Sequence, residues 1–511
     1  MGRTRAVRLR CARAVRLRCA RAVRLRCARA VPALCACAWG RARRVCGVTT
    51  TPIATLEPLT GGGHTVLMGS LADIDVAAAG YEQSEWRCSG VAASHAAPGA
   101  LGVDGRWSLS TDASAEFATR VVVRQPSDPM RSSGVMVLEW LNVSSGTDAA
   151  PVFGFAGPEI VRAGHTWVGV SAQWAGIVPA PALVDIGGPG LVALQEADPE
   201  RYGSLHHPGD AFSFDLFTQV ANALVATGGS EVSSPLHGLG ITTVLAVGES
   251  QSAYALSTYA NGMQPLSERF DGFLIHSRGG PVMGLGEPGR GADLDAGRDD
   301  PAVLIRTDLD VPVLVLQTET DVIGHLYSLP SRQPDTARIR TWEVAGAAHA
   351  DHSMVGDYER FLGCGQVNRG QQRFVVRAAL RHLVAWGANG SMPPHGEPLV
   401  VEGDPADGRR GLRFGVDDVG NVLGGVRTPS VDAPAEVLSG LSGPGASRAC
   451  MLFGRRLPAP ADVLAARYPG GTADYLTAYE RATDAAIDAG FILAEDRSEV
   501  LADAHPELIA P

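Results

Sequence analysis

Four mainly apolar segments of strand length, called apolar runs below, divide the middle of the chain. They occupy residues 134–140, 243–247, 311–317 and 339–344; the first three are rich in Val or Leu, and the fourth, IRTWEV, is a shorter strand that includes Arg340 and Glu343. Runs of this kind are typical of strands buried on both faces, as in parallel sheets. Apolar residues at helical spacing in 370–387 predict a helix there. Together these elements predict an α/β fold with a mostly parallel central sheet flanked by helices.

A short turn, Gly-Glu-Ser-Gln-Ser at residues 248–252, follows the second apolar run directly, and residues 253–260 then suit a helix. A serine at the centre of such a strand-to-helix turn is held out from the sheet edge in a strained backbone. Ser250 is therefore a candidate nucleophile. The alternative is that Ser250 only caps the helix, which is the commoner role of an isolated serine in this context.

The third and fourth apolar runs are each followed by a residue that a serine nucleophile requires. Asp321 comes after the third run and His349 after the fourth. Imidazole can take the serine proton at neutral pH, while a carboxylate on its other nitrogen fixes its tautomer and orientation. We expect Asp321 rather than Glu319 to be this acid, because it lies further past the strand end, where the chain can turn toward His349.

Acyl transfer also needs N–H groups that face the negative charge developing on the carbonyl oxygen. The backbone N–H of Gln251, directly after the serine, is predicted to supply one. The loop after the first apolar run is predicted to supply the other, from Leu141, Asn142 or Val143. The sequence does not choose among these three.

Four more polar residues near these motifs have two interpretations each. Glu249 either tunes the electrostatic potential beside the serine or holds the turn by hydrogen bonds. Arg278 either binds a substrate carboxylate or, as we favour, pairs with a structural acid. His207 either lines the pocket or, as we favour, has a structural role, and His352 is favoured as a loop residue over a metal ligand. We expect neither a metal nor a cofactor.

Seven sequence blocks together form a pattern more specific than the serine turn alone. They are VLEWLNV (137–143), WVGVSAQ (167–173), RYGSL (201–205) with HPGD (207–210), GESQS (248–252), FDGFLIHSR (270–278), TETD (318–321), and WEVAG (342–346) with HAD (349–351). The pattern resembles the bacterial α/β-hydrolase domain-containing proteins of the Abhydrolase_10 type, over almost all of residues 64–505. This resemblance implies a serine hydrolase fold, and it implies no particular substrate.

Residues 1–47 differ in composition from the rest of the chain. They contain 14 arginines, no acid and three tandem copies of an eight-residue unit, and the remainder carries 30 arginines against 54 acidic residues. A nucleic-acid or membrane arm, an export signal and a mistaken gene start are the three interpretations. We favour the third, with a true start near Val48, because the arginines extend too far for an export signal. The leader is expected to be disordered and dispensable.

Residues 48–511 are predicted to form a single domain that contains all three candidate catalytic residues. Insertions near 174–212 and 279–306 are expected to shape the pocket as lid segments. From about residue 388, frequent Gly and Pro predict an irregular extension with a helical end near 474–493.

The cysteines and the apolar runs bear on the location of the protein. Cys88, Cys364 and Cys450 are widely spaced and are expected to be buried thiols. No apolar run after Val48 approaches the roughly 20 residues that span a bilayer. We therefore expect a cytoplasmic protein, with export left open, that has neither nucleic acid nor membrane as a partner. The oligomeric state is left open.

These residues predict hydrolysis of a small-molecule ester through an acyl-enzyme on Ser250. The same residues would serve acyl transfer to another acceptor, or lactone or amide cleavage. A catalytically silent binding protein of the same fold is the alternative from another class, and the presence of serine, acid and histidine in the expected order argues against it.

Overall fold

The computed structural model describes residues 54–63, 67–69, 74–185, 191–227, 234–293, 295, 300–404 and 409–509. They belong to one compact unit, Pro52–Pro511. The arginine-rich leader lies outside the described residues, so its predicted disorder stays a prediction.

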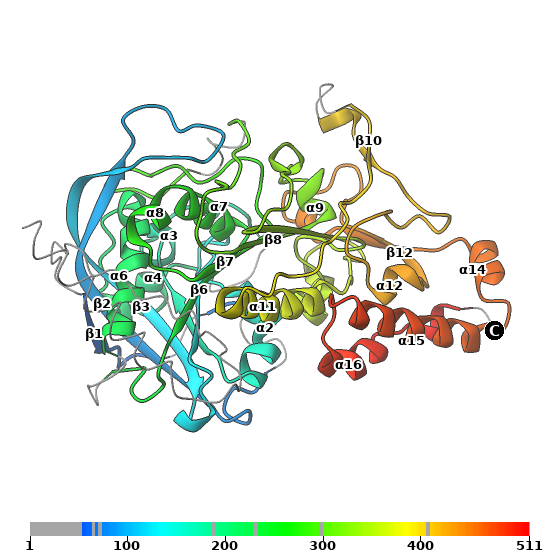
Figure 1. The fold of residues 1–511 in the computed structure, drawn as a ribbon, viewed down its shortest axis with the longest axis horizontal. Helices are drawn as coiled ribbons and strands as arrows, with labels where there is room; N and C mark the ends of the chain where they lie inside the picture. The colour runs from blue at the N-terminus through cyan, green and yellow to red at the C-terminus, as the bar shows by residue number, and fades with distance from the viewer. Residues whose placement is uncertain are drawn as a thin grey trace, which may run out of the picture. The chain divides into compact units, whose positions relative to one another are not determined.

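A nine-stranded sheet forms the centre of this unit (Figure 1). Strands β5, β4, β6, β7, β8 and β9 run parallel in that spatial order, and β3, β2 and β1 continue the sheet antiparallel beyond β5. The predicted α/β class with a mostly parallel sheet is confirmed. The bounds are β1 Thr55–Pro58, β2 Tyr81–Ala96, β3 Ser110–Pro126, β4 Val135–Trp140, β5 Thr166–Val170, β6 Thr243–Glu249, β7 Gly272–His276, β8 Val313–Thr318 and β9 Ile339–Val344.

The central strands bury side chains on both faces of the sheet. In β4, Met136 and Leu138 join one hydrophobic cluster, whereas Val137 between them joins the cluster on the opposite face. Successive side chains of a strand point to opposite faces, so an apolar core on each side favours apolar residues at most positions. This is why β6 and β8 consist mainly of apolar residues, whereas β9 also includes Arg340 and Glu343.

Helices cover the two faces of the sheet, as Figure 1 shows. Helices α6 (Ser213–Thr227) and α7 (Gln251–Thr258) lie on one face, and α2 (Pro151–Arg162) and α11 (Gln372–Asn389) lie on the other. Helix α11 matches the helix predicted at 370–387. The layers place the carboxyl ends of β6, β8 and β9 at one edge of the sheet, where the candidate residues are.

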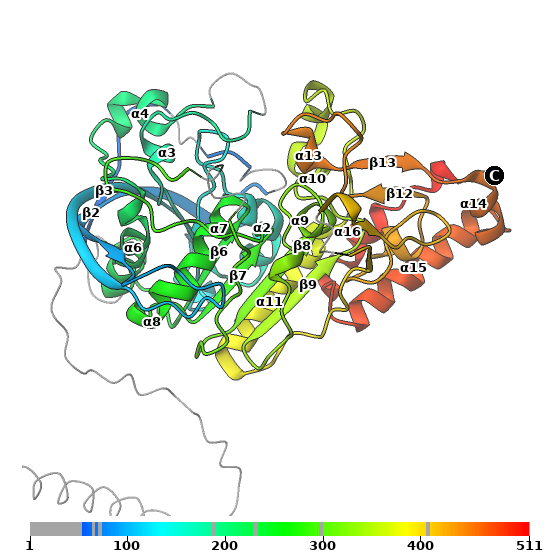
Figure 2. The same ribbon diagram turned by 90° about the horizontal axis from the view of Figure 1, so that it is seen from above.

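The region after α11 is more regular than the predicted irregular extension. Its residues form a separate apolar cluster that includes Tyr468, Tyr475, Tyr479 and Val500, and this packing stabilises elements too short to have a clear sequence pattern. Figure 2 shows these elements beside β8 and β9. They are β10 Val401–Glu402, β11 Arg413–Phe414, α12 Pro429–Asp432, β12 Glu436–Ser439, α13 Cys450–Phe453, β13 Arg455–Pro458, α14 Ala461–Arg467, α15 Thr472–Asp488 and α16 Arg497–Ala502.

A disulfide bond joins Cys364 to Cys450, 86 residues apart. The prediction of buried thiols is therefore wrong for these two residues, because the fold brings distant segments together, and it holds for Cys88. Disulfides are typical of oxidising compartments. The bond argues against the expected cytoplasmic location, which stays a prediction. In the described part of the chain, no helix is both long and apolar enough to cross a bilayer.

Candidate active site

Ser250 occupies the sharp turn between β6 and α7. Its φ of 59° and ψ of −121° are rare for a residue with a side chain, and its N–H donates to the His276 carbonyl oxygen at 2.9 Å. A Cβ on Gly248 would lie 2.8 Å from the Cβ of Ser252. The turn therefore accommodates Ser252 only because residue 248 is glycine.

His349 connects Ser250 to Asp321. The Ser250 hydroxyl and His349 Nε2 are 2.8 Å apart, and His349 Nδ1 lies 2.8 Å from Asp321 Oδ1. Asp321 is fully buried and His349 is 3% exposed. The structure thus brings together the three residues that the sequence singled out, although they come from three separate strand ends.

The other oxygen of Asp321 is held by three donors. Thr318 donates its N–H at 2.7 Å and its hydroxyl at 2.9 Å, and the Ser277 hydroxyl donates at 2.7 Å. Asp321 lies in the first turn of the short helix α9 (Glu319–Val322), where it forms a capping box with Thr318. These bonds fix the carboxylate with Oδ1 facing His349.

Glu319 faces away from His349. Its two carboxylate oxygens accept the backbone N–H groups of Gly346 at 2.6 Å and of Gly440 at 2.8 Å. Burial raises its pKa to about 7, although these two hydrogen bonds oppose the shift. Glu319 therefore ties the loop that carries His349 to the C-terminal region.

The loop that carries His349 is anchored by α11. Gln372, the first residue of that helix, donates its side-chain N–H to the Ala348 carbonyl oxygen at 2.7 Å. The N–H of His349 donates to the Thr320 hydroxyl at 3.1 Å. Both bonds hold the backbone beside the imidazole, so the ring needs little reorganisation to meet the serine.

Glu249 lies on the same side of His349 as Ser250. Its Oε1 is 3.1 Å from His349 Nε2, and both side chains are 4% exposed. Burial lowers the pKa of His349, but the adjacent carboxylates of Glu249 and Asp321 outweigh this effect and raise it. Burial raises the pKa of Glu249 to about 7, against the effect of His349.

The predicted oxyanion donors differ in how they are used. The N–H groups of Leu141 and Asn142 already donate to backbone carbonyl oxygens, at 3.2 and 2.9 Å, so neither is available. The N–H of Val143 donates to Gln251 Oε1 at 3.1 Å, a side-chain acceptor that can move. Asn142 instead holds the serine turn, because its side chain donates to the Glu249 carbonyl oxygen at 3.1 Å.

Arg278 and His207 both have structural surroundings. The buried guanidinium of Arg278 donates to the carbonyl oxygens of Gly279, Gly280 and Val303, and among the described residues it forms no ion pair. The predicted pairing with an acid is therefore wrong, since backbone carbonyl oxygens accept the hydrogen bonds of this guanidinium. His207 is buried, accepts the Gly209 N–H at 3.1 Å, and supports the loop before α6.

A small cavity of about 50 Å³ opens beside Ser250. The first predicted insertion contributes Leu183 and Val184 to its wall, and the second contributes Pro281. Arg448 and Leu452, from the C-terminal region, complete this side. Neither residue was predicted from the sequence, because no motif surrounds them and the fold alone brings them to the serine.

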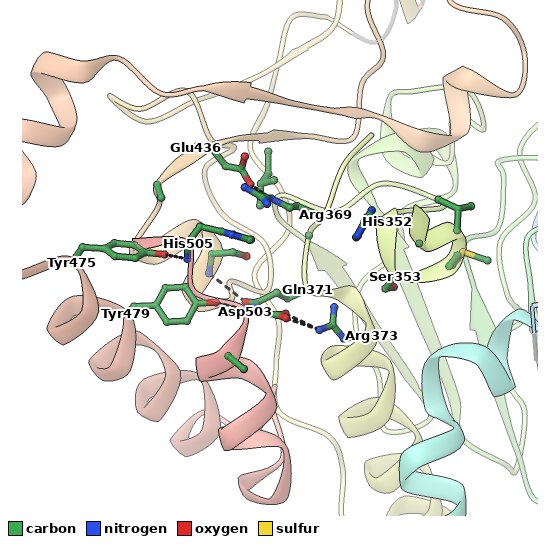
Figure 3. Close-up of a pocket in the computed structure, with 18 residues that line it drawn as sticks. His352, Ser353, Arg369, Gln371, Arg373, Glu436, Tyr475, Tyr479, Asp503 and His505 are labelled. Carbon is green, nitrogen blue, oxygen red and sulfur yellow. Dashed lines mark hydrogen bonds and ion pairs between the residues drawn. The ribbon is translucent and has the colours of Figure 1, made fainter. Parts of the chain in front are cut away.

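A larger cavity of about 540 Å³ lies elsewhere, lined by α11 and the C-terminal helices (Figure 3). Its arginines are already paired: Arg369 with Glu436 at 2.5 Å and Arg373 with Asp503 at 2.7 Å. His352 also lines this cavity and contacts Glu359 at 2.8 Å. Within the described ranges, no cluster of three or more His, Cys, Asp or Glu side chains is arranged to hold a metal.

Among the comparisons with known proteins, a family match identifies the fold. A family model described as an alpha/beta hydrolase domain, Abhydrolase_10, matches residues 55–502. The search of curated proteins found no match. Solved structures with a similar chain path include a putative dienelactone hydrolase from Klebsiella pneumoniae, which is 13% identical with a TM-score of 0.28 and is matched over 58% of this chain and 99% of that one. A glucuronoyl esterase from Solibacter usitatus is 9% identical, with a TM-score of 0.27 and coverage of 62% and 86%. At these TM-scores the two likenesses support no further conclusion about this chain.

Proposed function

The chain belongs to the alpha/beta hydrolase domain family Abhydrolase_10, and from this premise we propose that it is a serine hydrolase of carboxylic esters. The observation that carries the proposal is the pair of 2.8 Å contacts through which His349 connects the Ser250 hydroxyl to the Asp321 carboxylate. In this arrangement, His349 can act as the general base that removes the proton of the weakly nucleophilic serine hydroxyl, and the Asp321 carboxylate orients the imidazole.

The reaction would proceed in two steps. Ser250 Oγ attacks the ester carbonyl while its proton moves to His349 Nε2, and Asp321 stabilises the imidazolium that forms. The alcohol leaves with the proton from Nε2, and an acyl group stays on Ser250. Water, deprotonated by the same nitrogen, then attacks the acyl group on Ser250 and releases it as the carboxylic acid product.

The N–H groups of Gln251 and Val143 are the proposed oxyanion donors. The Gln251 N–H lies at the start of α7. The Val143 N–H donates to the side-chain oxygen Oε1 of Gln251. A substrate carbonyl oxygen would displace that side chain and take its place. Two donors of this kind would stabilise the tetrahedral intermediate.

A fluorophosphonate probe tests the nucleophile without knowledge of the natural substrate. We expect the wild-type protein to be labelled, and Ser250→Ala and His349→Ala to lose labelling and ester turnover by orders of magnitude with an unchanged thermal melt. A wild-type protein that resists labelling would indicate a silent binding protein. A panel of esters, lactones, amides and acyl acceptors would then rank the reactions that this triad permits.

A further inference from the structure

Two side chains compete for one nitrogen of His349. Nε2 lies 2.8 Å from the Ser250 hydroxyl oxygen and 3.1 Å from Glu249 Oε1. A neutral imidazole that donates its Nδ1 proton to Asp321 has only a lone pair at Nε2. An ionised carboxylate repels that lone pair and attracts an N–H at the same place. The contact therefore distinguishes the two protonation states of the ring.

Glu249 differs from two other buried glutamates beside the sheet, Glu139 and Glu319. Glu139 accepts the N–H groups of Val152 and Phe153, at 2.8 and 3.0 Å, and Glu319 accepts two backbone N–H groups. Those carboxylates hold backbone in place. In the described part of the chain, the ion-pair partner of Glu249 is His349. Among the described residues, Glu249 has neither the backbone donors that hold Glu139 nor the arginine partners that hold the buried Glu85.

The charged groups near this pair are few and all are buried. Asp321 faces Nδ1 of His349, and His276 lies close enough to influence both Asp321 and His349. Glu139 and Asp321 both act on Glu249 by charge repulsion. The only one of these groups placed to stabilise a proton on Nε2 is the carboxylate of Glu249.

We propose that Glu249 is a positioning residue that acts through His349, by stabilising the proton that His349 Nε2 receives from Ser250. The Oγ–H bond breaks and the Nε2–H bond forms, and Glu249 accepts a hydrogen bond without taking the proton. Above the raised pKa of Glu249, about 7, the carboxylate is ionised, so the gain exists in the transition state and not in the resting state and raises the rate of attack. This inference rests on the proposed function of Ser250 and His349.

For Glu249→Gln, the proposal predicts the direction of change of the pH profile and of the plateau rate. Loss of the carboxylate removes an influence that raises the pKa of His349, so the acid limb of the pH profile moves to lower pH. The plateau rate at high pH falls, because the imidazolium is less stable. We expect a shift of about one pH unit and a plateau about tenfold lower.

The measurement is the second-order rate of fluorophosphonate modification of the full chain from pH 5 to pH 9. Serine oxygen displaces fluoride from phosphorus, and the rate reports the reactivity of Ser250 without a natural substrate. Glu319→Gln is the matched control, since that buried glutamate faces away from His349 and its loss leaves the midpoint of the profile unchanged.

Each outcome decides between the two proposals. A Glu249→Gln profile with the wild-type midpoint and plateau overturns the role of Glu249 and leaves the serine hydrolase standing. Absence of Ser250-dependent labelling in the wild-type protein overturns the hydrolase itself.

If the thermal melt shows that Glu249→Gln does not fold, the NMR signal of the His349 Nδ1 proton in the wild-type protein is followed with pH. Two coupled titration steps support the proposal, and a single step overturns it.

Discussion

Asp321 and Glu319 are two residues apart and both fully buried, yet their carboxylates face different parts of the protein. They lie in the first turn of α9, where each residue rotates the side chain by about 100°. Two positions therefore differ by about 200°. Asp321 faces His349, and Glu319 faces the N–H groups of two loops.

This difference predicts unequal effects of two neutral substitutions. Asp321→Asn should lower kcat by roughly a thousandfold or more, because the imidazole loses the partner that fixes its tautomer. Glu319→Gln should keep kcat near the wild-type value and lower the melting temperature. Steady-state kinetics with one ester and a thermal melt of each variant test this, and the reverse ranking of kcat would move the role to Glu319.

Glu319 also predicts how stability changes with pH. Burial raises its pKa from 4.5 in the unfolded chain to about 7 in the fold. A carboxyl with a raised pKa stabilises the fold fully below pH 4.5, and this contribution is lost as the pH rises through 7. The melting temperature of Glu319→Gln, measured relative to that of the wild-type protein, should therefore rise from pH 5 to pH 8. A constant difference across this range would contradict the assignment.

The roles of single residues were partly accessible from the sequence. The order of Ser250, Asp321 and His349, each after a strand, predicted which side chains meet. The use of the N–H groups of Leu141 and Asn142 was not accessible, because it depends on which backbone carbonyl each one meets in the folded loop.

Among the elements, the buried strands and α11 followed from the sequence, and the C-terminal region did not. A strand buried on both faces has an apolar residue at most positions, so β6 and β8 appear as mainly apolar runs. The outer strand β2 mixes buried and exposed positions without strict alternation, and has no such signal. The short C-terminal elements depend on packing between distant segments, which one sequence does not reveal.

Helix α13 links the disulfide to the candidate active site. It contains Cys450 and Leu452; Leu452 lines the cavity beside Ser250, and its carbonyl oxygen accepts the N–H of Ala350 at 3.0 Å. Cleavage of the disulfide should destabilise the protein by about 2 kcal/mol or more and raise KM more than it lowers kcat. The test compares the wild-type protein with and without a reductant. The double variant Cys364→Ala/Cys450→Ala is the control and should not respond to the reductant; a wild-type protein that responds as little as the control would contradict the link.

At the scale of the whole molecule, all candidate site residues belong to one part of the chain, which excludes the leader. Residues 52–511 form one compact unit with the candidate residues inside it. A chain that starts at Val48 should match the full chain in thermal stability and esterase rate, because the 14 leader arginines cannot build a core. Intact-mass analysis of the natural protein would show whether the leader is made. Loss of membrane or nucleic-acid association in the shortened chain would identify the arginines as a binding arm.

The bond between Cys364 and Cys450 also determines what a protease can do to this protein. The two cysteines, 86 positions apart, enclose a span that carries the last core helix, α11, and part of the wall beside Ser250. A single cut within that span would leave two pieces of chain that remain covalently joined. The nicked protein would run as one band without a reductant and as two with it, and would keep the packing around His349 that a separated fragment would lose.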